Sequence, residues 1–457
     1  MSVMVLFRTA LSVVLLVCGQ SFGSPVRRDT CYSTASSPYR HYSTHTDYND
    51  VRGHGEDFGL PGCQPRKFYM LSRHGIRYPT DGSYDFEKRH LPRLHTLAVD
   101  SMHKGSLCKA DQDAIRHWEY RFHSHDAGAL AASGKQEAYE LGKRYEKRFP
   151  NLVGRSYSRD RYDFQHTYIQ RTEDTARAIA NAFFNQSNIH MSVASHCDSK
   201  LLFYGCCQKF RTTVHDKPLV DHVDFRDSHE MLGVISAVTS RLGLQHGTVS
   251  FHDVEAMYDA CAFEHGVYRS SPWCAVFSDD DIKVMEYYED LRYYWEFGYG
   301  HSINYEQTCD LVKDLIGYLR GSSSVTGMIR VAHDLTMMPF LSRLGAYQDS
   351  SPPRSTTMAR QSHRNFRSSI MAPFLSNVVF VEYQCGSESK VRAFHNEKPL
   401  TLPMCPASGC PLSSILNSYL GSAANTCDFQ RTCEYSSHHN CDGHVTHSGT
   451  CVPTIIG

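Results

Sequence analysis

The residues best suited to chemistry lie in one short segment, residues 73–79, which reads Arg-His-Gly-Ile-Arg-Tyr-Pro. The imidazole of His74 can act as a nucleophile, and the guanidinium groups of Arg73 and Arg77 can hold an anion in fixed forks. The pattern Arg-His-Gly-x-Arg-x-Pro fixes five positions, so a chance match in one chain is rarer than about one in a thousand. The segment therefore predicts an anion site beside a nucleophilic histidine.

Two other segments carry the same kinds of residue. Arg171 follows a strand-like run at residues 164–169, and His333 and Asp334 follow another at residues 328–332. Ligands of open α/β sheets bind at the carboxyl ends of the strands. We therefore expect one site that contains Arg73, His74, Arg77, Arg171, His333 and Asp334.

The elements that must position these residues alternate between short β-rich runs and amphipathic helices, which predicts an α/β fold. The expected strands are residues 68–71, 164–169 and 328–332, with a late antiparallel pair at 378–383 and 391–394. Five helices are expected. The first begins at a capping box of Ser133 and Gln136 and stops at Pro150, the second begins at Thr172-Glu173-Asp174, and the third begins at Ser278 with Asp281. The fourth spans Leu311 to Leu319 before Gly321, and the fifth spans Met337 to Leu344 before Gly345.

The chain of 457 residues is long enough for two or three lobes. We expect a signal peptide at 1–23, a first core segment at 24–195 with a loop or helical insertion at about 85–130, a helical lobe at 196–304, a second core segment at 305–405, and a Cys-rich tail at 406–457. No internal repeat stands out.

Composition excludes some classes of function. With 41% apolar and 21% charged residues the chain can bury a large core. Lys plus Arg number 47 and Asp plus Glu 48, which argues against a nucleic-acid binder with a strongly basic surface. Protonation of most of the 27 His would bring the net charge to roughly +20 or more near pH 5. An acidic setting would therefore suit an anionic substrate.

The first residues indicate an oxidising compartment. The apolar run Ala10–Cys18 is too short to span a bilayer but suits a secretory signal, with Ser21 and Gly23 spaced as at a cleavage site; an amphipathic anchor is the alternative. No later stretch reaches the ~18 to 20 apolar residues that a spanning helix needs. The end of the chain is not a KDEL-type retention signal, so we expect secretion or a lumenal location.

The cysteines favour the same compartment. Of 17 Cys, Cys18 would leave with the signal, and the remaining 16 fit disulfides. We expect local pairs, and the candidates are Cys405 with Cys410, Cys261 with Cys274, and the tail residues Cys427, Cys433, Cys441 and Cys451. The tail histidines His438, His439, His444 and His447 raise the alternative of zinc, but their spacing fits no standard finger. Asn185 begins a glycosylation sequon.

On these motifs the chain resembles a known family. The segment RHGIRYPT at 73–80 and the segment AHDLT at 332–336 are similar to the histidine acid phosphatase superfamily. The stretches at 201–210, 271–307 and 395–405 resemble its multiple inositol polyphosphate phosphatase branch, and the similarity runs from about residue 42 to 419. The resemblance implies a three-layer core, with a mostly parallel sheet flanked by helices, and an inserted helical lobe.

The resemblance also implies roles for the site residues. His74 would be the nucleophile and form a phosphohistidine, Asp334 would protonate the leaving alcohol, and the phosphoryl group would be held by Arg73, Arg77, Arg171 and His333. No cofactor or metal is implied. Neighbouring cations should lower the pKa of His74, and bound phosphate should raise that of Asp334.

This chain departs from the branch at two places. The branch usually carries His-Ala-Glu, but here the sequence is His333-Asp334-Leu335, and because leucine cannot move a proton we assign the donor to Asp334. The match around Arg171 has threonines where serines are usual. The alternative for Arg171 is an ion pair with Glu173 or Asp174.

The leading hypothesis is a secreted phosphomonoesterase with an acid optimum that hydrolyses inositol polyphosphates such as phytate. A broad-specificity acid phosphatase is the close alternative, and a non-catalytic anion-binding secreted protein is the alternative of another class. A cytosolic mutase fits poorly with a signal peptide and many cysteines. Lys88, Arg89 and Arg93 are candidates to bind neighbouring phosphates, with a solvated basic face as the alternative. The sequence indicates no oligomeric state.

Overall fold

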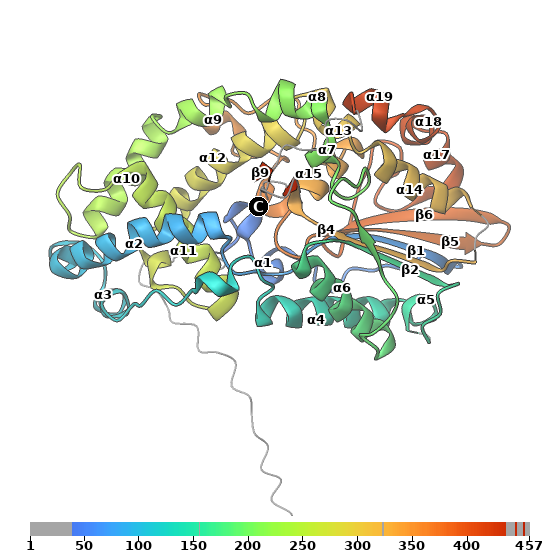
Figure 1. Ribbon diagram of the computed structural model, residues 1–457, viewed down its shortest axis with the longest axis horizontal. Coiled ribbons are helices and arrows are strands. Elements are labelled where there is room, and N and C mark those ends of the chain that lie inside the picture. Colours follow the sequence, from blue (N-terminus) through green and yellow to red (C-terminus); the bar gives the residue numbers. More distant parts are fainter. Residues whose placement is uncertain (1–38, 155, 322–323, 436–443, 446–450, 453–457) are drawn as a thin grey trace, which may run out of the picture.

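The computed structural model describes residues 39–154, 156–321, 324–435, 444–445 and 451–452 (Figure 1). These residues do not test the expected signal peptide or the zinc alternative for the tail histidines. Among the described residues, no helix combines the length and apolar character needed to cross a bilayer.

A single large sheet forms the centre of the molecule. Its strands are β1 (Gln64–Arg73), β2 (Tyr162–Thr167), β3 (Ser192–Ala194), β4 (Gly327–Ala332), β5 (Asn377–Cys385), β6 (Glu388–His395), β7 (Lys398–Pro399) and β8 (Cys410–Pro411), in the order β3-β2-β4-β1-β5-β6-β7, with β8 paired to β6. The strands β3, β2, β4 and β1 are parallel, and β5 to β8 add an antiparallel half. The predicted α/β class and late antiparallel pair are confirmed, and parallel pairing is confined to one half of the sheet.

The remaining elements are almost all helical. The helices are α1 (Tyr48–Val51), α2 (Asp81–Ser101), α3 (Lys109–Arg116), α4 (Ala132–Arg148), α5 (Pro150–Val153), α6 (Gln170–Phe184), α7 (Phe203–Cys206), α8 (Gln208–Phe210), α9 (Val220–Phe225), α10 (His229–Arg241), α11 (Phe251–Tyr268), α12 (Asp279–Phe297), α13 (Ser302–Glu306), α14 (Cys309–Arg320), α15 (Asp334–Arg343), α16 (Ser368–Met371), α17 (Leu412–Leu416), α18 (Tyr419–Thr426) and α19 (Phe429–Cys433). A short 3-10 turn, η1 (Ser43–His45), precedes α1, and β9 (His444–Val445) pairs with β10 (Cys451–Val452).

Alternation along β1 explains the three layers. Phe68 and Met70 point into a core shared with α4 and α6, whereas Tyr69 and Leu71 point into a core shared with α14 and α15. Figure 1 shows these helices on opposite sides of the sheet. A strand that is buried on both faces reads as a continuous apolar run, as residues 68–71 do.

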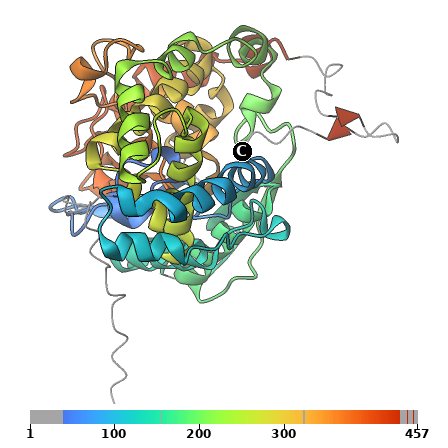
Figure 2. The same ribbon diagram turned by 90° about the vertical axis from the view of Figure 1, so that its left-hand side faces the viewer.

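A second body of helices lies beside the sheet. Helices α7 to α13 all fall between β3 and α14, and α2 joins them because Leu91 and Leu94 pack into one core with Met257 of α11 and Tyr287 of α12. Figure 2 shows the blue α2 against the green and yellow helices. The division of the chain into lobes stays a prediction.

Helix starts were only partly predictable. Ser278 and Asp281 form the expected capping box of α12, and α14 ends before Gly321 as expected. The predicted box at Ser133 is wrong, because α4 begins at Ala132 without a side-chain cap and the Ser133 hydroxyl has no partner among the described residues. Helix α6 begins at Gln170, and the Thr172 hydroxyl donates to the carbonyl of Ile169 instead of capping.

Contact with the motif segment fixes the start of α4. The Ala131 N–H donates to the carbonyl of Ile76 at 2.8 Å, and a Cβ on Gly134 would lie 2.2 Å from the same oxygen. A Cβ on Gly75 would lie 2.7 Å from the carbonyl oxygen of Gly134. Two glycines therefore let the helix and the motif segment touch through their backbones.

We expect Gly134→Ala to destabilise the protein by about 2 kcal/mol, because the added methyl overpacks a backbone contact. The midpoint of thermal unfolding measures this effect. Gly82→Ala in α2 is the matched control, since a Cβ there meets nothing within 4 Å. Equal midpoints for the two variants would contradict the close-contact explanation.

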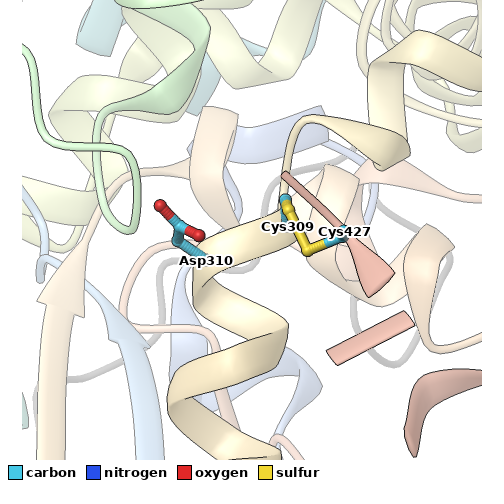
Figure 3. Close-up of side chains that lie close together, drawn as sticks. All are labelled: Cys309, Asp310 and Cys427. Atoms are coloured by element: carbon cyan, nitrogen blue, oxygen red, sulfur yellow. A yellow bond between two sulfur atoms is a disulfide. The ribbon is translucent and has the colours of Figure 1, made fainter. Parts of the chain in front are cut away.

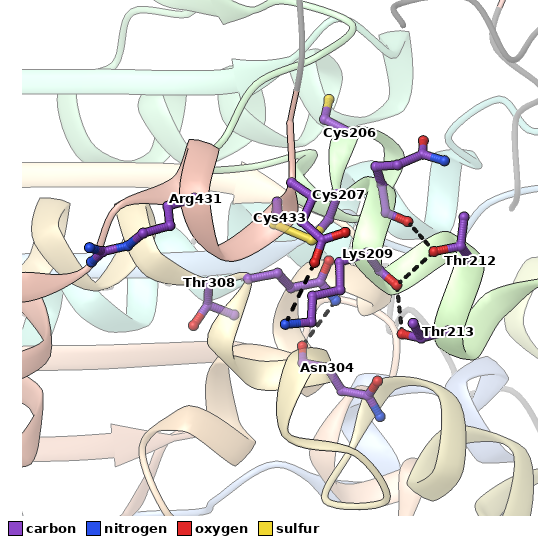
Figure 4. Close-up of a disulfide and its surroundings, with 12 residues drawn as sticks. Cys206, Cys207, Lys209, Thr212, Thr213, Asn304, Thr308, Arg431 and Cys433 are labelled. Carbon is purple, nitrogen blue, oxygen red and sulfur yellow. Dashed lines mark hydrogen bonds and ion pairs between the residues drawn. A yellow bond between two sulfur atoms is a disulfide. The ribbon is translucent and has the colours of Figure 1, made fainter.

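The disulfides were predicted in part. Cys405–Cys410 and Cys261–Cys274 form the expected local pairs. Local pairing is wrong for two of the four tail cysteines: Cys427 bonds to Cys309, while Asp310 points away from this bond (Figure 3), and Cys433 bonds to Cys207 (Figure 4). The expected pairing of Cys441 and Cys451 lies outside what the described residues can test. Cys63–Cys385 and Cys197–Cys206 are also bonded. The tail pairs were missed because helices α18 and α19 fold back onto α14 and α8.

Candidate active site

Three strand ends bring the predicted residues together. The last residue of β1, Arg73, is in register with Ala332 of β4, and Val331 of β4 is in register with His166 of β2. The next residue, His74, donates its N–H to the carbonyl of Ala332 at 3.0 Å. All six predicted residues therefore lie at one edge of the parallel half of the sheet, as the strand-end argument requires.

His74 is buried, and one of its two ring nitrogens forms a hydrogen bond. Its Nδ1 lies 2.9 Å from the carbonyl oxygen of Gly75, so this nitrogen carries the proton and donates, and Nε2 keeps the free lone pair. Burial lowers the pKa of His74 well below 6.5, and the charges of Arg171 and Arg73 lower it further. A histidine with this pKa stays neutral in acid, which is the state that a nucleophile needs.

Three buried arginines surround this imidazole. Arg73 donates Nη1 to the carbonyls of Thr44 and Ala372, and it stacks on Phe374 with 4.6 Å between the guanidinium carbon and the ring centroid. Among the described residues, the Nε groups of Arg73, Arg77 and Arg171 have no hydrogen-bond partner. Burial, followed by the charges of Arg171 and Arg73, lowers the pKa of Arg77 to about 9. Such an excess of buried positive charge favours the binding of an anion.

Arg171 does not form the alternative ion pair. Glu173 is paired with Arg177 at 2.7 Å, and Asp174 accepts from Gln170 at 3.2 Å. Arg171 lies in the first turn of α6, is buried, and donates Nη1 to the carbonyl of Gly128 at 3.4 Å. Its side chain therefore belongs to the arginine group around His74.

His333 immediately precedes α15 and faces His74. The two ring centroids are 5.5 Å apart, and the Nε2 of His333 lies 3.0 Å from the hydroxyl oxygen of Thr167 at the end of β2. Burial and the charge of Arg171 lower the pKa of His333 well below 6.5. Thr167 thus orients a ring that is neutral before any anion binds.

We expect Thr167→Val to reduce kcat by about tenfold, because it leaves a buried imidazole nitrogen without its partner. Steady-state kinetics with p-nitrophenyl phosphate measure this change. Thr167→Ser keeps the hydroxyl and should restore most of the rate. If serine and valine gave the same loss, the hydroxyl would have no orienting role.

Asp334 is the first residue of α15 and the carboxyl group of the site. Its Oδ2 accepts a hydrogen bond from the Tyr293 hydroxyl at 3.2 Å and lies 3.5 Å from Nη2 of Arg73. Burial by itself raises the pKa of Asp334, but the charges of Arg73, His333 and Arg77 outweigh burial and hold this pKa below its usual value of 3.8. In the free site Asp334 is therefore a carboxylate.

Several residues that complete the site are not among the six predicted from the sequence. Tyr293, from the C-terminal half of α12, holds Asp334, and its oxygen also lies 3.0 Å from the hydroxyl of Thr44. Phe374 stacks on Arg73, and Thr175 accepts the Gly75 N–H at 3.1 Å. Tyr293 and Phe374 lie outside the segments that predicted the site, whereas Thr175 lies four residues after Arg171 and belongs to the match around it.

Groups spaced to hold a metal ion lie elsewhere in the described residues. One is Asp47, Asp50 and His265, in which Asp47 is already paired with Arg269. The other is Cys309, Asp310 and Cys427, in which the two cysteines form a disulfide. Neither group includes a residue of the site.

Asn185 lies apart from the site. It is the exposed residue that ends α6, with a left-handed backbone conformation. An exposed position is what a glycosylation sequon requires, and modification there stays a prediction.

Curated relatives share most of this chain. This chain is 29% identical over 410 residues to multiple inositol polyphosphate phosphatase 1 of Drosophila melanogaster, and the alignment covers 86% of this chain and 87% of that protein. It is 27% identical over 446 residues to the Homo sapiens protein of the same name, with coverage of 88% and 90%.

Solved structures show the same fold. The phytase from D. castellii matches with a TM-score of 0.70 at 17% identity over 88% of each chain. The multiple inositol polyphosphate phosphatase of Bifidobacterium longum in complex with inositol hexasulfate matches with a TM-score of 0.62 at 16% identity, over 83% of this chain and 97% of that one.

The family model "Histidine phosphatase superfamily (branch 2)" matches residues 66–396. This range begins in β1, ends just after β6, and contains all six residues of the predicted site. The resemblance carried by the two short motifs is confirmed, and the chain belongs to the histidine phosphatase superfamily, branch 2.

Proposed function

We propose that this protein hydrolyses phosphate monoesters of the inositol polyphosphate class through a phosphohistidine at residue 74. The observation that carries the proposal is the free Nε2 of His74 beside three buried arginines whose Nε groups have no partner among the described residues. The relatives named multiple inositol polyphosphate phosphatase 1 support the substrate class, since they match most of the chain.

In the first half-reaction, Nε2 of His74 forms a bond to phosphorus while the bond from phosphorus to the leaving oxygen breaks. The guanidinium groups stabilise the charge on the equatorial oxygens. The leaving oxygen takes a proton from Asp334, which becomes a carboxylate. In the second half-reaction this carboxylate accepts a proton from water as the water oxygen forms a bond to phosphorus. The bond from phosphorus to Nε2 of His74 breaks and its electron pair returns to that nitrogen, which releases phosphate and restores both groups.

Asp334 needs a proton before it can act as the acid. Because the cations of the site lower its pKa, the group is ionised in the free protein. A bound phosphate ester brings up to two negative charges, which offset those cations and raise the pKa of Asp334. Acidic conditions favour the protonated complex, while the lowered pKa of His74 keeps the nucleophile neutral. The proposal therefore includes an acid optimum.

We also propose that the mature protein is secreted or lumenal. The signal-like first segment supports this, and so do the six described disulfides, which persist in oxidising compartments.

The test is hydrolysis of phytate and of p-nitrophenyl phosphate by the purified protein between pH 3 and 8, with and without chelator. We expect release of phosphate from both, an acid optimum, and no loss with chelator. Comparable turnover of both would favour a broad acid phosphatase, and binding without hydrolysis would favour the non-catalytic alternative. Loss of activity with chelator would contradict the mechanism.

A further inference from the structure

A cavity of about 180 Å³ opens beside the phosphoryl site on the side of the proton donor. Arg77 and Asp334 belong to its lining, so the cavity is continuous with the site described above. The Nε of Arg77 has no partner among the described residues, and the Arg77 side chain is only 4% exposed. A phosphate bound to Arg77 would therefore place its leaving group in this cavity.

The far side of the cavity is acidic. Apart from Arg77 and Asp334, the acidic residues of its lining are Glu255 and Asp259 from α11 and Glu289 from α12, and the basic residues are Arg292 from α12 and His45 from η1. Glu255 accepts from His252 at 3.0 Å, and Asp259 lies 3.7 Å from the Nδ1 of His45.

Glu289 is the least compensated of these carboxyl groups. Within the described residues no hydrogen bond or ion pair joins it to another side chain, and Arg292 is instead paired with Glu296 at 3.3 Å. Burial raises the pKa of Glu289 to about 8; Arg292 opposes this rise, and Glu255, Asp259 and Asp290 add to it. Burial also raises the pKa of Glu255.

The other charged groups around Glu289 do not reverse this effect. His45, on η1, has a pKa lowered by burial and is therefore neutral over most of the pH range. At the phosphoryl end, Arg77 is the residue proposed to hold the substrate anion, and Asp334 is itself acidic. The leaving-group side of the site is thus negative once its carboxyl groups ionise.

The three basic residues of α2 that the sequence offered for additional phosphates do not line this cavity. Lys88, Arg89 and Arg93 on α2 are exposed and absent from its lining, and Arg93 is paired with Asp253 at 2.6 Å. Lys88 lies over the rings of Tyr84 and Tyr120. The solvated basic face is therefore the better description of these three residues.

We propose that Glu255, Asp259 and Glu289 set the substrate range of this site. As carboxylates they repel a leaving group that carries further phosphates and accept hydrogen bonds from hydroxyl groups. When protonated, Glu255 and Glu289 donate hydrogen bonds to those phosphates. In acid the site then accepts highly phosphorylated substrates. As the pH rises, its substrate range narrows to molecules whose scissile phosphate is flanked by free hydroxyls. This inference rests on the proposed function.

The first test uses the unaltered protein and two inhibitors that do not titrate between pH 5 and 9, inositol hexasulfate and inorganic sulfate. Their inhibition constants are measured against p-nitrophenyl phosphate. We expect the constant for inositol hexasulfate to rise at least fivefold more than that for sulfate, because only the hexasulfate reaches the acidic side with extra charge. Parallel changes in the two constants would overturn the inference.

The second test uses Glu289→Gln and the ratio of kcat/KM for phytate to kcat/KM for p-nitrophenyl phosphate. Removal of one ionisable group should raise this ratio about fivefold at pH 8.5 and change it little at pH 5, where Glu289 is already protonated. Glu388→Gln is the matched control, since Glu388 is an exposed residue at the start of β6, is in register with Cys385, and does not line the cavity. Circular dichroism confirms that each variant is folded.

The outcomes separate the two proposals. A ratio that is unchanged in Glu289→Gln and in the double variant with Glu255→Gln overturns the role of the carboxyl groups, while hydrolysis of p-nitrophenyl phosphate leaves the proposed function intact. If the unaltered protein hydrolyses neither substrate, the proposed function itself fails. If the double variant does not fold, the inhibitor comparison on the unaltered protein decides the matter.

Discussion

His74→Ala should lower kcat by about 10⁴-fold or more with either phytate or p-nitrophenyl phosphate. The reason is that, in the proposed mechanism, the bond to phosphorus forms at Nε2 of this residue, and the neighbouring arginines are permanent donors that cannot replace a nucleophile. His333 cannot substitute without movement, because its Nε2 is engaged with Thr167. A phosphorylated peptide containing residue 74 should be recovered from the acid-quenched native protein and be absent from the variant.

Controls must separate the loss of a nucleophile from the loss of a buried ring. His74→Gln keeps much of the volume and a hydrogen-bonding group, so it should be folded and equally inactive. His125→Ala removes a histidine whose side chain is 77% exposed and should retain full activity. Appreciable turnover by His74→Ala, or a phosphorylated peptide from another part of the chain, would disprove covalent catalysis at this residue.

Asp334→Asn is expected to lower kcat much more for substrates with a poor leaving group than for substrates with a good one. With phytate, whose alkoxide leaving group needs a proton, kcat should fall by about 10² to 10⁴-fold. With p-nitrophenyl phosphate the loss should stay below about tenfold, because nitrophenolate leaves without much help. Single-turnover and steady-state rates on both substrates measure this division.

Two comparisons test the assignment of the donor. Tyr293→Phe removes the hydrogen bond to Asp334 but keeps the carboxyl, so it should produce a weaker form of the same division. Leu335→Ala probes the position at which the branch usually carries its acid, and it should not discriminate between leaving groups. Equal losses on both substrates in Asp334→Asn would mean that this carboxyl does not transfer the proton.

The sequence determined which residues meet at the candidate site because each motif lies at or just after the end of a strand. An apolar run must be buried as a strand, and consecutive polar residues after it must then emerge at its carboxyl end. Once β1, β2 and β4 pair in parallel, Arg73, His74, Arg171 and His333 have no other place to meet. The same local logic predicted the capping box of Ser278 and the disulfides within single loops.

The tertiary structure decided what depends on contacts between distant parts of the chain. The start of α4 follows from its contact with Ile76, although Ser133 offered a local cap. Cys427 and Cys433 pair with cysteines far away in the sequence because α18 and α19 fold back. The hydroxyl that holds Asp334 belongs to Tyr293 of α12. The acidic cavity has the same origin, since α11 and α12 bring together carboxyl groups that look like ordinary solvated charges in the sequence. Sequence patterns record which residues must be buried, whereas the partners of a buried or half-buried side chain are set by the packing of separate elements.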